Sequence, residues 1–293
     1  MARKWKLRKG EVGSSREGTK SIMRNYNIFI TNDDGIESPG LRAAVESVLD
    51  IGTVTVVAPS HQQTGTGRGL IGDMRSSLQR IDYQVNGSEI RAYHCDCSPA
   101  LIVNHSLKTI FRENRPDLLI SGINYGENLG INITHSGTIG AALEASSSGI
   151  TSIAISKQTD IASHNKYTDQ DWTAAVYFLN RFAKTLLKEK LQTDVNVLKI
   201  DVPSDATPLT KWKITKLAKV GYYSRPIKNA TAHSKICDGR TIINIDKENL
   251  DPDTDIYAFA IDKLVSVTPL SVDLTSRVKP SDLQGLLGKN TIL

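Results

Sequence analysis

Residues 26–36 read YNIFITNDDGI, and this stretch decides the fold. Its short apolar, β-branched start predicts a buried strand, which the adjacent carboxylates of Asp33 and Asp34 close abruptly before Gly35. Adjacent carboxylates repel each other, and each costs free energy to desolvate. A hard cation such as Mg²⁺ or Mn²⁺ prefers oxygen ligands and would offset both costs. The alternative is a solvated Asp-Asp-Gly turn without a ligand.

Strand and helix patterns alternate from this stretch to about residue 202. Buried-type strands are predicted at 27–30, 53–58, 117–121, 152–156 and 195–202, with weaker extended pieces at 73–82 and 89–95. Helices are predicted at 39–49, 99–108, 138–148 and 171–188. Short apolar strands that alternate with helices indicate an α/β fold with a mostly parallel sheet covered on both faces. In such sheets ligands bind at the carboxyl ends of the strands.

Beyond about residue 203 the sequence changes to prolines, aromatics and short alternating stretches. Extended pieces are predicted at 212–219, 241–246, 257–260 and 265–268, and a helix at 281–287. Hairpins and extended arms of this kind commonly build contacts between subunits. We therefore predict a single domain over residues 23–293, in which about 204–293 forms hairpins and an extended oligomerisation arm.

The composition is that of an ordinary soluble globular protein, since the 293 residues are 39% hydrophobic and 23% charged. The sequence lacks a run of about eighteen apolar residues, so it predicts no transmembrane helix and no membrane partner. The three cysteines, Cys95, Cys97 and Cys237, complete no zinc motif, which favours reduced thiols in a cytoplasmic protein.

The net charge of +5 belongs to the N-terminal tail. Residues 1–22 hold seven Lys or Arg against two Glu, so the rest of the chain sums to zero. Few apolar residues and several Gly and Ser predict a disordered basic tail over 1–22. The chain beyond residue 22 carries no excess of basic side chains, which argues against nucleic acid as a partner. Binding of nucleic acid through the tail alone stays an open alternative.

Two further polar stretches follow predicted strands. Residues 121–130 read SGINYGENLG, and residues 134–142 read THSGTIGAA at the start of a predicted helix. The glycines let a ligand approach the backbone closely, and Asn124 and Asn128 offer side-chain amides. Ser136 and Thr138 lie at the helix start, where free backbone N–H groups make an anion site. The alternative is a capped helix after a glycine-rich loop.

The stretch 59–69, PSHQQTGTGRG, is less specific. Thr64 offers a hydroxyl to a metal and Arg68 a guanidinium to a phosphate, but a surface loop fits equally well. The chain contains no P-loop, no Gly-x-Gly-x-x-Gly motif after the first strand and no Gly-x-Ser-x-Gly elbow. A metal held by two carboxylates beside an anion pocket indicates phosphoryl transfer.

Together these motifs resemble the SurE family of survival-protein nucleotidases. The resemblance rests on 31–40 (TNDDGIESPG), on Thr64 with Gly65, and on 121–130 with 136–138, and it runs in order from about residue 26 to 276. A weaker echo is VSVTPL at 265–270. The chain departs from the family where Thr64 replaces the usual Ser, and where CSPALI at 97–102 lacks an acidic residue.

The resemblance implies a Rossmann-like three-layer α/β/α fold and a 5'-nucleotidase, a phosphoric monoester hydrolase that converts nucleoside monophosphates to nucleoside and phosphate. It also implies one divalent ion, Mg²⁺ or Mn²⁺, per subunit, and a homodimer or homotetramer. Asp33 and Asp34 would be the catalytic pair. The implied metal ligands are Asp33, Asp34, Thr64 and Asn124, and the implied phosphate-binding residues are Asn128, Ser136, Gly137 and Thr138.

Two alternatives to this activity stay open. One is a broader phosphatase or exopolyphosphatase that uses the same machinery. The other is a non-catalytic nucleotide-binding protein that keeps the site as a ligand sensor.

Overall fold

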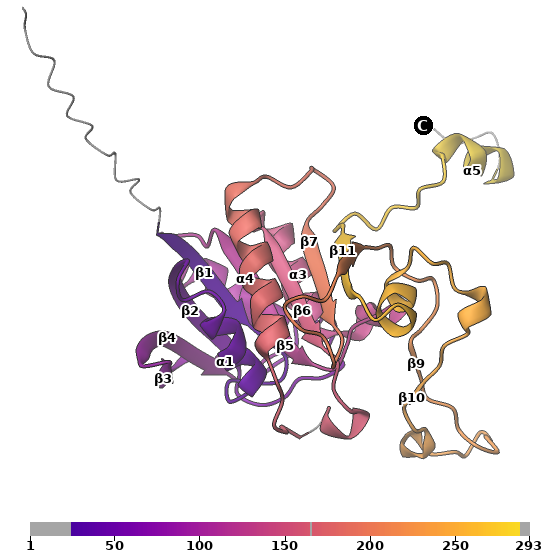
Figure 1. The fold of residues 1–293 in the computed structure, drawn as a ribbon, viewed down its shortest axis with the longest axis horizontal. Helices are drawn as coiled ribbons and strands as arrows, with labels where there is room; N and C mark the ends of the chain where they lie inside the picture. Colours follow the sequence, from indigo (N-terminus) through magenta and orange to yellow (C-terminus); the bar gives the residue numbers. More distant parts are fainter. Residues whose placement is uncertain (1–24, 165, 288–293) are drawn as a thin grey trace, which may run out of the picture.

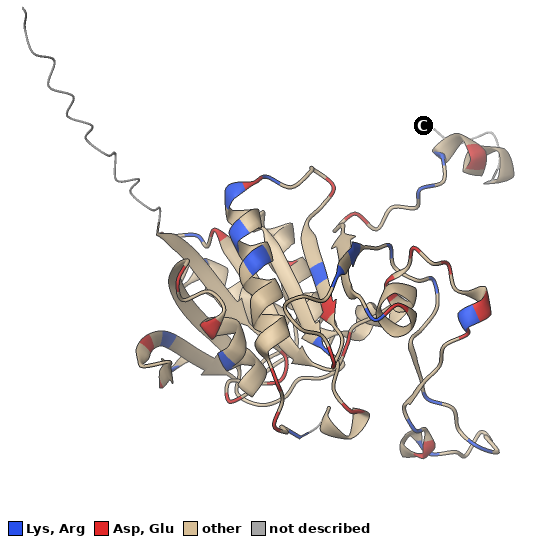
Figure 2. Ribbon diagram, viewed as in Figure 1, with Lys and Arg blue, Asp and Glu red and all other residues tan. Residues whose placement is uncertain are grey.

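The structure is a computed structural model that describes residues 25–164 and 166–287. The predicted basic tail, 1–22, lies outside the described residues. Figure 1 shows a central twisted sheet with helices on both faces and an extended C-terminal segment at one side. In the described part, Lys and Arg are interspersed with Asp and Glu along the ribbon (Figure 2). None of the described helices is both long and apolar enough to cross a membrane.

Nine strands of the described residues form one sheet in the order β3-β4-β2-β1-β5-β6-β7-β11-β8. Their bounds are β1 Tyr26–Thr31, β2 Gly52–Pro59, β3 Gln79–Val85, β4 Ser88–Cys95, β5 Leu118–Tyr125, β6 Ser152–Lys157, β7 Val197–Val202, β8 Trp212–Ile214 and β11 Val265–Leu270. The strands from β4 to β7 in this order are mutually parallel, while β3 and β11 pair antiparallel to their neighbours β4 and β7. The predicted mostly parallel sheet is therefore confirmed.

Two pairs of helices pack on the two faces of this sheet through two separate hydrophobic cores, so the fold has the three predicted layers. They are α1 (Pro39–Glu46) with α4 (Thr173–Lys188), and α2 (Pro99–Lys108) with α3 (Gly137–Ser147). The surroundings of β1 explain the apolar run at its centre. Ile28 and Ile30 pack into the core under α1 and α4, and Phe29 packs into the other core with α2 and α3.

The point where the strand order reverses lies at β1 and β5. β1 pairs with β2 on one side and β5 on the other, and the later parallel strands add outward in both directions. A crevice forms at the carboxyl ends of the strands at such a switch point, and ligands bind there. Asp33 follows β1 and Asn124 lies at the end of β5, so the fold brings the two main polar motifs together.

The C-terminal segment is only partly a hairpin arm. β8 and β11 join the main sheet, and only β9 (Tyr223–Ser224) and β10 (Ile242–Ile243) form a separate two-stranded pair. The helix predicted near the C-terminus is α5 (Pro280–Leu287). The remaining short helices are η1 (Ile131–His135), η2 (Ile161–Ser163), η3 (Ile236–Asp238), η4 (Lys247–Asn249) and η5 (Tyr257–Ile261).

The prediction of an extended piece at 257–260 is wrong, because η5 is a π-helical turn. Ile256 and Phe259 both pack into a small core with Leu129 and Tyr222. Residues three apart share one face of a helical turn, so the turn buries both side chains at once. A four-residue apolar stretch does not distinguish this spacing from strand alternation.

Candidate active site

A hydrogen-bonded turn after β1 holds the two carboxylates. Asn32 closes it, because its side-chain Nδ2 donates to the carbonyl of Gly35 at 2.9 Å and its Oδ1 accepts from the Gly35 N–H at 3.2 Å. Gly35 has a φ of +106°, which a side chain would disfavour. Asp33 and Asp34 are only 4% and 2% exposed, so the solvated-turn alternative is excluded.

Each carboxylate is oriented by groups from other elements. The Asp34 carboxylate accepts from the Tyr125 N–H at 3.0 Å and from Gln62 Nε2 at 3.3 Å. The hydroxyl of Thr138 donates to Asp33 Oδ1 at 2.5 Å. Among the described residues, no Lys, Arg or His forms an ion pair with either carboxylate. The turn therefore concentrates buried negative charge that described basic side chains do not neutralise.

This burial has an electrostatic consequence. Desolvation raises the pKa of Asp33 above its ordinary value, although the hydrogen bond from the Thr138 hydroxyl opposes the rise. Desolvation also raises the pKa of Asp34, and the neighbouring Asp33 charge raises it further. A bound cation would reverse both effects, because it stabilises the ionised form of each carboxylate.

The first turn of α3 lies directly against Asp33. A Cβ atom at Gly137 would come within 2.7 Å of Asp33 Cβ and 2.8 Å of Asp33 Oδ2. The Ser136 hydroxyl caps the helix by accepting from the Ile139 N–H at 3.2 Å. Thr138 Oγ1 also lies 3.1 Å from Asn124 Oδ1. Strand end, helix start and carboxylate turn thus meet at one place, and the glycine is required for that approach.

The 60–69 stretch folds back over the same place. The Gln63 N–H donates to the Asp33 carbonyl at 2.7 Å, and the Gly67 N–H donates to the His135 carbonyl at 3.0 Å. A Cβ atom at Gly140 would lie 2.0 Å from the Gly67 carbonyl oxygen, so this stretch packs tightly on α3. Tertiary contacts therefore hold the stretch at Gln63 and Gly67, while Thr64 and Gly65 between them are exposed, as the surface-loop alternative expects.

The suggested role of Arg68 is not supported. Its Nε forms an ion pair with Glu144 Oε2 at 2.9 Å, and its Nη2 donates to Ser147 Oγ at 2.7 Å. These partners lie along α3, and Arg68 does not line the cavity beside Asp33. The guanidinium fastens the loop to the helix.

One cavity of about 430 Å³ collects most of the predicted residues. Its wall includes Asp33, Thr64, Asn124, Asn128 and Ser136. Asp34, Gly137 and Thr138 lie immediately behind that wall, through the contacts described above. The sequence therefore predicted a set of residues that the fold does bring together.

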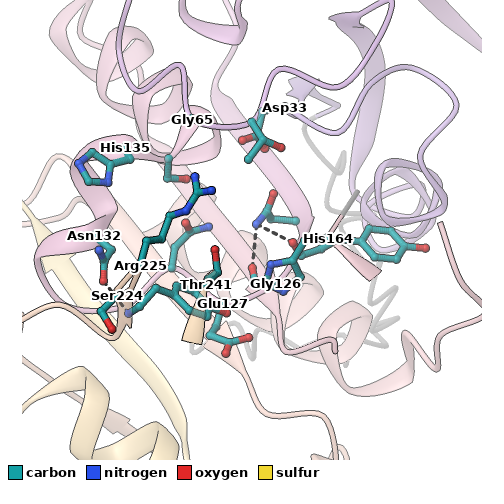
Figure 3. Close-up of a pocket in the computed structure, with 16 residues that line it drawn as sticks. Asp33, Gly65, Gly126, Glu127, Asn132, His135, His164, Ser224, Arg225 and Thr241 are labelled. Atoms are coloured by element: carbon teal, nitrogen blue, oxygen red, sulfur yellow. Dashed lines mark hydrogen bonds between the residues drawn. The ribbon is translucent and has the colours of Figure 1, made fainter. Parts of the chain in front are cut away.

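The far side of the cavity was not anticipated. Figure 3 shows the Arg225 side chain reaching from the C-terminal segment toward the side where Gly65 lies. The unanticipated lining residues include Glu127, Asn132, His135, His164, Tyr223, Ser224, Arg225 and Thr241. Glu127 and His135 lie inside or beside the motifs already recognised, so the sequence held a signal for them. The lining residues between 223 and 241 are about a hundred residues away in sequence, and the sequence held no signal for them.

The donor chemistry of the site suits a hard divalent cation. The oxygens at hand are two carboxylates, the amide oxygen of Asn124 and the hydroxyl of Thr64. Within the described residues, no group of three or more His, Cys, Asp and Glu is placed to bind a metal. Carboxylate, amide and hydroxyl oxygens are the ligand types that hard divalent cations take.

A family model described as "Survival protein SurE" matches residues 28–224, which is more than half of the chain. The chain belongs to the SurE family. The matched range includes the carboxylate turn, the 60–69 stretch and the start of α3, whereas Arg225 and Thr241 of the cavity wall lie beyond it.

Curated relatives in the SurE family match nearly the whole chain. The protein named 5'-nucleotidase SurE from Thermococcus gammatolerans is 40% identical over 261 residues, which cover 89% of this chain and 95% of that protein. The protein of the same name from Thermococcus kodakarensis is 37% identical, with coverage of 89% and 98%. The solved SurE protein from Aquifex aeolicus has a TM-score of 0.71 and 28% identity, and covers 89% of this chain and 100% of its own.

Proposed function

We propose that this SurE-family chain is a metal-dependent phosphomonoesterase that hydrolyses nucleoside monophosphates to nucleoside and phosphate. The proposal is supported by the relatives named 5'-nucleotidase SurE. The observation that carries it is a buried Asp33–Asp34 pair, without a described basic partner, in which Asp33 lines the cavity and lies against the start of α3. That combination suits a phosphoryl group held between a cation and backbone N–H groups.

Each subunit would hold one cation through four residues, Asp33, Asn124 and Thr64 of the cavity wall and Asp34 behind it. When bound, Mg²⁺ or Mn²⁺ would neutralise charge on the phosphoryl oxygens and lower the pKa of a coordinated water. The Thr138 hydroxyl holds Asp33 Oδ1 in place, and the Tyr125 N–H and Gln62 hold the Asp34 carboxylate. Supported ligands of this kind need little rearrangement to accept an ion.

The phosphoryl group would lie between that ion and the start of α3. Ser136 Oγ accepts from the Ile139 N–H, which leaves its own hydroxyl hydrogen free for a phosphoryl oxygen. The amide of Asn128 lines the same wall. The Thr138 hydroxyl donates to Asp33, and the backbone N–H groups of Gly137 and Thr138 face the same carboxylate, so a phosphoryl oxygen at these two residues would share their N–H donors with Asp33.

A panel of phosphate esters tests the proposal. The protein, stripped of metal with a chelator, is assayed with nucleoside monophosphates, p-nitrophenyl phosphate and polyphosphate, with and without Mg²⁺, Mn²⁺ or Co²⁺. Metal-dependent phosphate release from nucleoside monophosphates supports the proposal. Faster release from polyphosphate or from simple esters would favour the broader phosphatase, and nucleotide binding without release would favour the non-catalytic sensor.

Thr64 tests the metal ligands specifically. Thr64→Ser keeps the hydroxyl and is expected to leave the metal concentration for half-maximal activity within about twofold. Thr64→Val keeps the shape but removes the oxygen, and is expected to raise that concentration roughly tenfold or more. Metal titrations of activity for the two variants provide the measurement. Equal behaviour of the Ser and Val variants would remove Thr64 from the ligand set.

We also propose a homodimer or homotetramer built through residues 204–293, in the cytoplasm. Exposed apolar side chains on this segment support the first part, since Leu209 is 92% and Ile236 90% exposed. The free thiols of Cys95, Cys97 and Cys237 support the second. Light scattering of the protein at micromolar concentration should give at least the mass of a dimer. The mass of a monomer would contradict the proposal.

A further inference from the structure

A buried charged cluster lies behind the phosphate end of the cavity. Lys199 and Asp201 on β7, and Asp255 just before η5, have fully buried side chains. Lys199 Nζ pairs with Asp201 and lies 3.2 Å from Asp255 Oδ2. None of the three residues lines the cavity. We call them the charged cluster.

The charged cluster holds the backbone of Asn128 from both sides. Lys199 Nζ donates to the Asn128 carbonyl at 2.9 Å, and the Asn128 N–H donates to Asp201 Oδ1 at 2.7 Å. The side-chain Nδ2 of Asn128 donates to Ser156 Oγ at 2.8 Å. Three hydrogen bonds from β6 and β7 thus fix the position and the direction of this one residue.

Asp255 extends the same hold to the C-terminal segment. Its Oδ2 accepts from the Gly130 N–H at 2.9 Å, two residues beyond Asn128. Its Oδ1 accepts from the N–H groups of Ala218 and Ile256, each at 2.9 Å. The residues that lead into β9, and therefore to Tyr223 in the cavity wall, are fastened to the loop that carries Asn128.

Stability alone does not account for this arrangement. Desolvating a charged group costs several kcal/mol, and apolar residues of similar volume are often as good or better in the same place. One ammonium also faces two carboxylates here, so the charges of the cluster do not balance. The two carboxylates instead accept hydrogen bonds from backbone N–H groups. The charged groups instead fix the orientation of the backbone, because a hydrogen bond is strong only within a narrow range of distances and angles.

We propose that Lys199, Asp201 and Asp255 are positioning residues that fix the Asn128 amide for the phosphoryl group and tie it to the C-terminal segment. This inference rests on the proposed function, because it takes Asn128 as a phosphate contact. The charged cluster touches neither substrate nor metal. Its effect on turnover passes through the loop 126–130 and through the C-terminal segment that Asp255 ties to that loop.

Asp201→Asn is the first test. An Asn side chain has nearly the same shape but keeps only one acceptor oxygen, so its NH2 group would face one of the two donors, the Asn128 N–H or Lys199 Nζ. The constant for inhibition by inorganic phosphate, and KM for the nucleotide, are expected to rise about tenfold, as for other supporting contacts. The metal concentration for half-maximal activity is expected to change less than twofold, because Asp33, Asp34 and Asn124 are untouched.

Ser146→Ala is the matched control. Ser146 is also buried, and its hydroxyl donates to the Asn196 carbonyl at 2.8 Å, beside the opposite end of β7. Its loss removes a buried hydrogen bond without touching the loop, so phosphate inhibition is expected to stay at the wild-type value. If the two variants lose equal thermal stability and both keep wild-type phosphate inhibition, the charged cluster is structural only and the inference is overturned.

A second variant covers the case in which Asp201→Asn does not fold. Lys199→Met combined with Asp201→Asn removes one charge of each sign and leaves Asp255 with its three backbone N–H donors. Weaker phosphate inhibition in this folded variant supports the inference, and wild-type inhibition overturns it.

Hydrogen exchange separates this inference from the proposed function. Exchange in the peptide that spans residues 126–130 is measured by mass spectrometry in the wild type, in the folded cluster variant and in Ser146→Ala. Faster exchange in the cluster variant alone supports the tie to the loop even if the wild type releases no phosphate, a result that would refute only the proposed function. Exchange equal to that of Ser146→Ala overturns the tie.

Discussion

Asp33→Asn and Asp34→Asn are each expected to lower kcat with Mn²⁺ or Mg²⁺ by at least about a hundredfold while the protein stays folded. The carboxylates are buried next to each other, and described basic side chains do not neutralise them. Removing one anion weakens the hold on the cation and, with it, the stabilisation of charge on the phosphoryl group. The protein should still fold, because each change relieves a desolvation cost that offsets the weaker hydrogen bonds to the new side chain.

Steady-state assays and thermal melts, with and without metal, measure this effect. The rise in melting temperature on adding metal should be lost together with activity. Asp50→Asn is the matched control, because Asp50 is an exposed carboxylate that pairs with Lys184 at 2.7 Å on the surface. A loss of only a few-fold in the Asp33 and Asp34 variants, with the metal-induced shift intact, would contradict the ligand assignment.

Gly137→Ala is expected to lower kcat by about a hundredfold and to destabilise the fold by about 1–3 kcal/mol. The added methyl would lie 2.7 Å from Asp33 Cβ and 3.0 Å from Thr66 Oγ1, so α3 or the carboxylate turn must move. Either movement separates the helix start from the cation ligands. Displacements of about 1 Å at such sites cost about two orders of magnitude in rate.

Gly285→Ala serves as the control for this change. Gly285 lies in α5, and an added Cβ there would meet nothing within 4 Å. It should retain full activity. A Gly137→Ala protein with wild-type kcat would show that the close approach of α3 to Asp33 is not needed for turnover.

Much of the fold was predictable because the strands of a doubly covered parallel sheet are mostly apolar. β1, β2, β6 and β7 were each found from such runs to within a few residues. The end of β5 was not, since the strand continues to Tyr125 through glycine and asparagine. Its pairing with β6 resumes at Asn124 after a register shift, and such pairing is tertiary information that a local pattern does not hold.

The candidate site likewise contains residues that the sequence predicted and residues that it did not. Asp33, Asn124 and Ser136 were predictable because each lies in a polar motif directly after a strand or before a helix. Arg225 was not, because only the folded C-terminal segment brings it to the cavity. Lys199 and Asp201 lie in a strand that reads as buried, and the sequence gives no sign that their charges meet Asn128.

The most direct test of the central claim is a crystal structure of the wild-type protein soaked with Mn²⁺ and vanadate, examined by anomalous scattering from manganese. We expect one manganese peak per subunit, bound by Asp33, Asp34 and Asn124 at distances of about 2.1 Å, with vanadate between that ion and the first turn of α3. A manganese peak elsewhere, or none at this turn in crystals of protein that hydrolyses nucleoside monophosphates with Mn²⁺, would contradict the account.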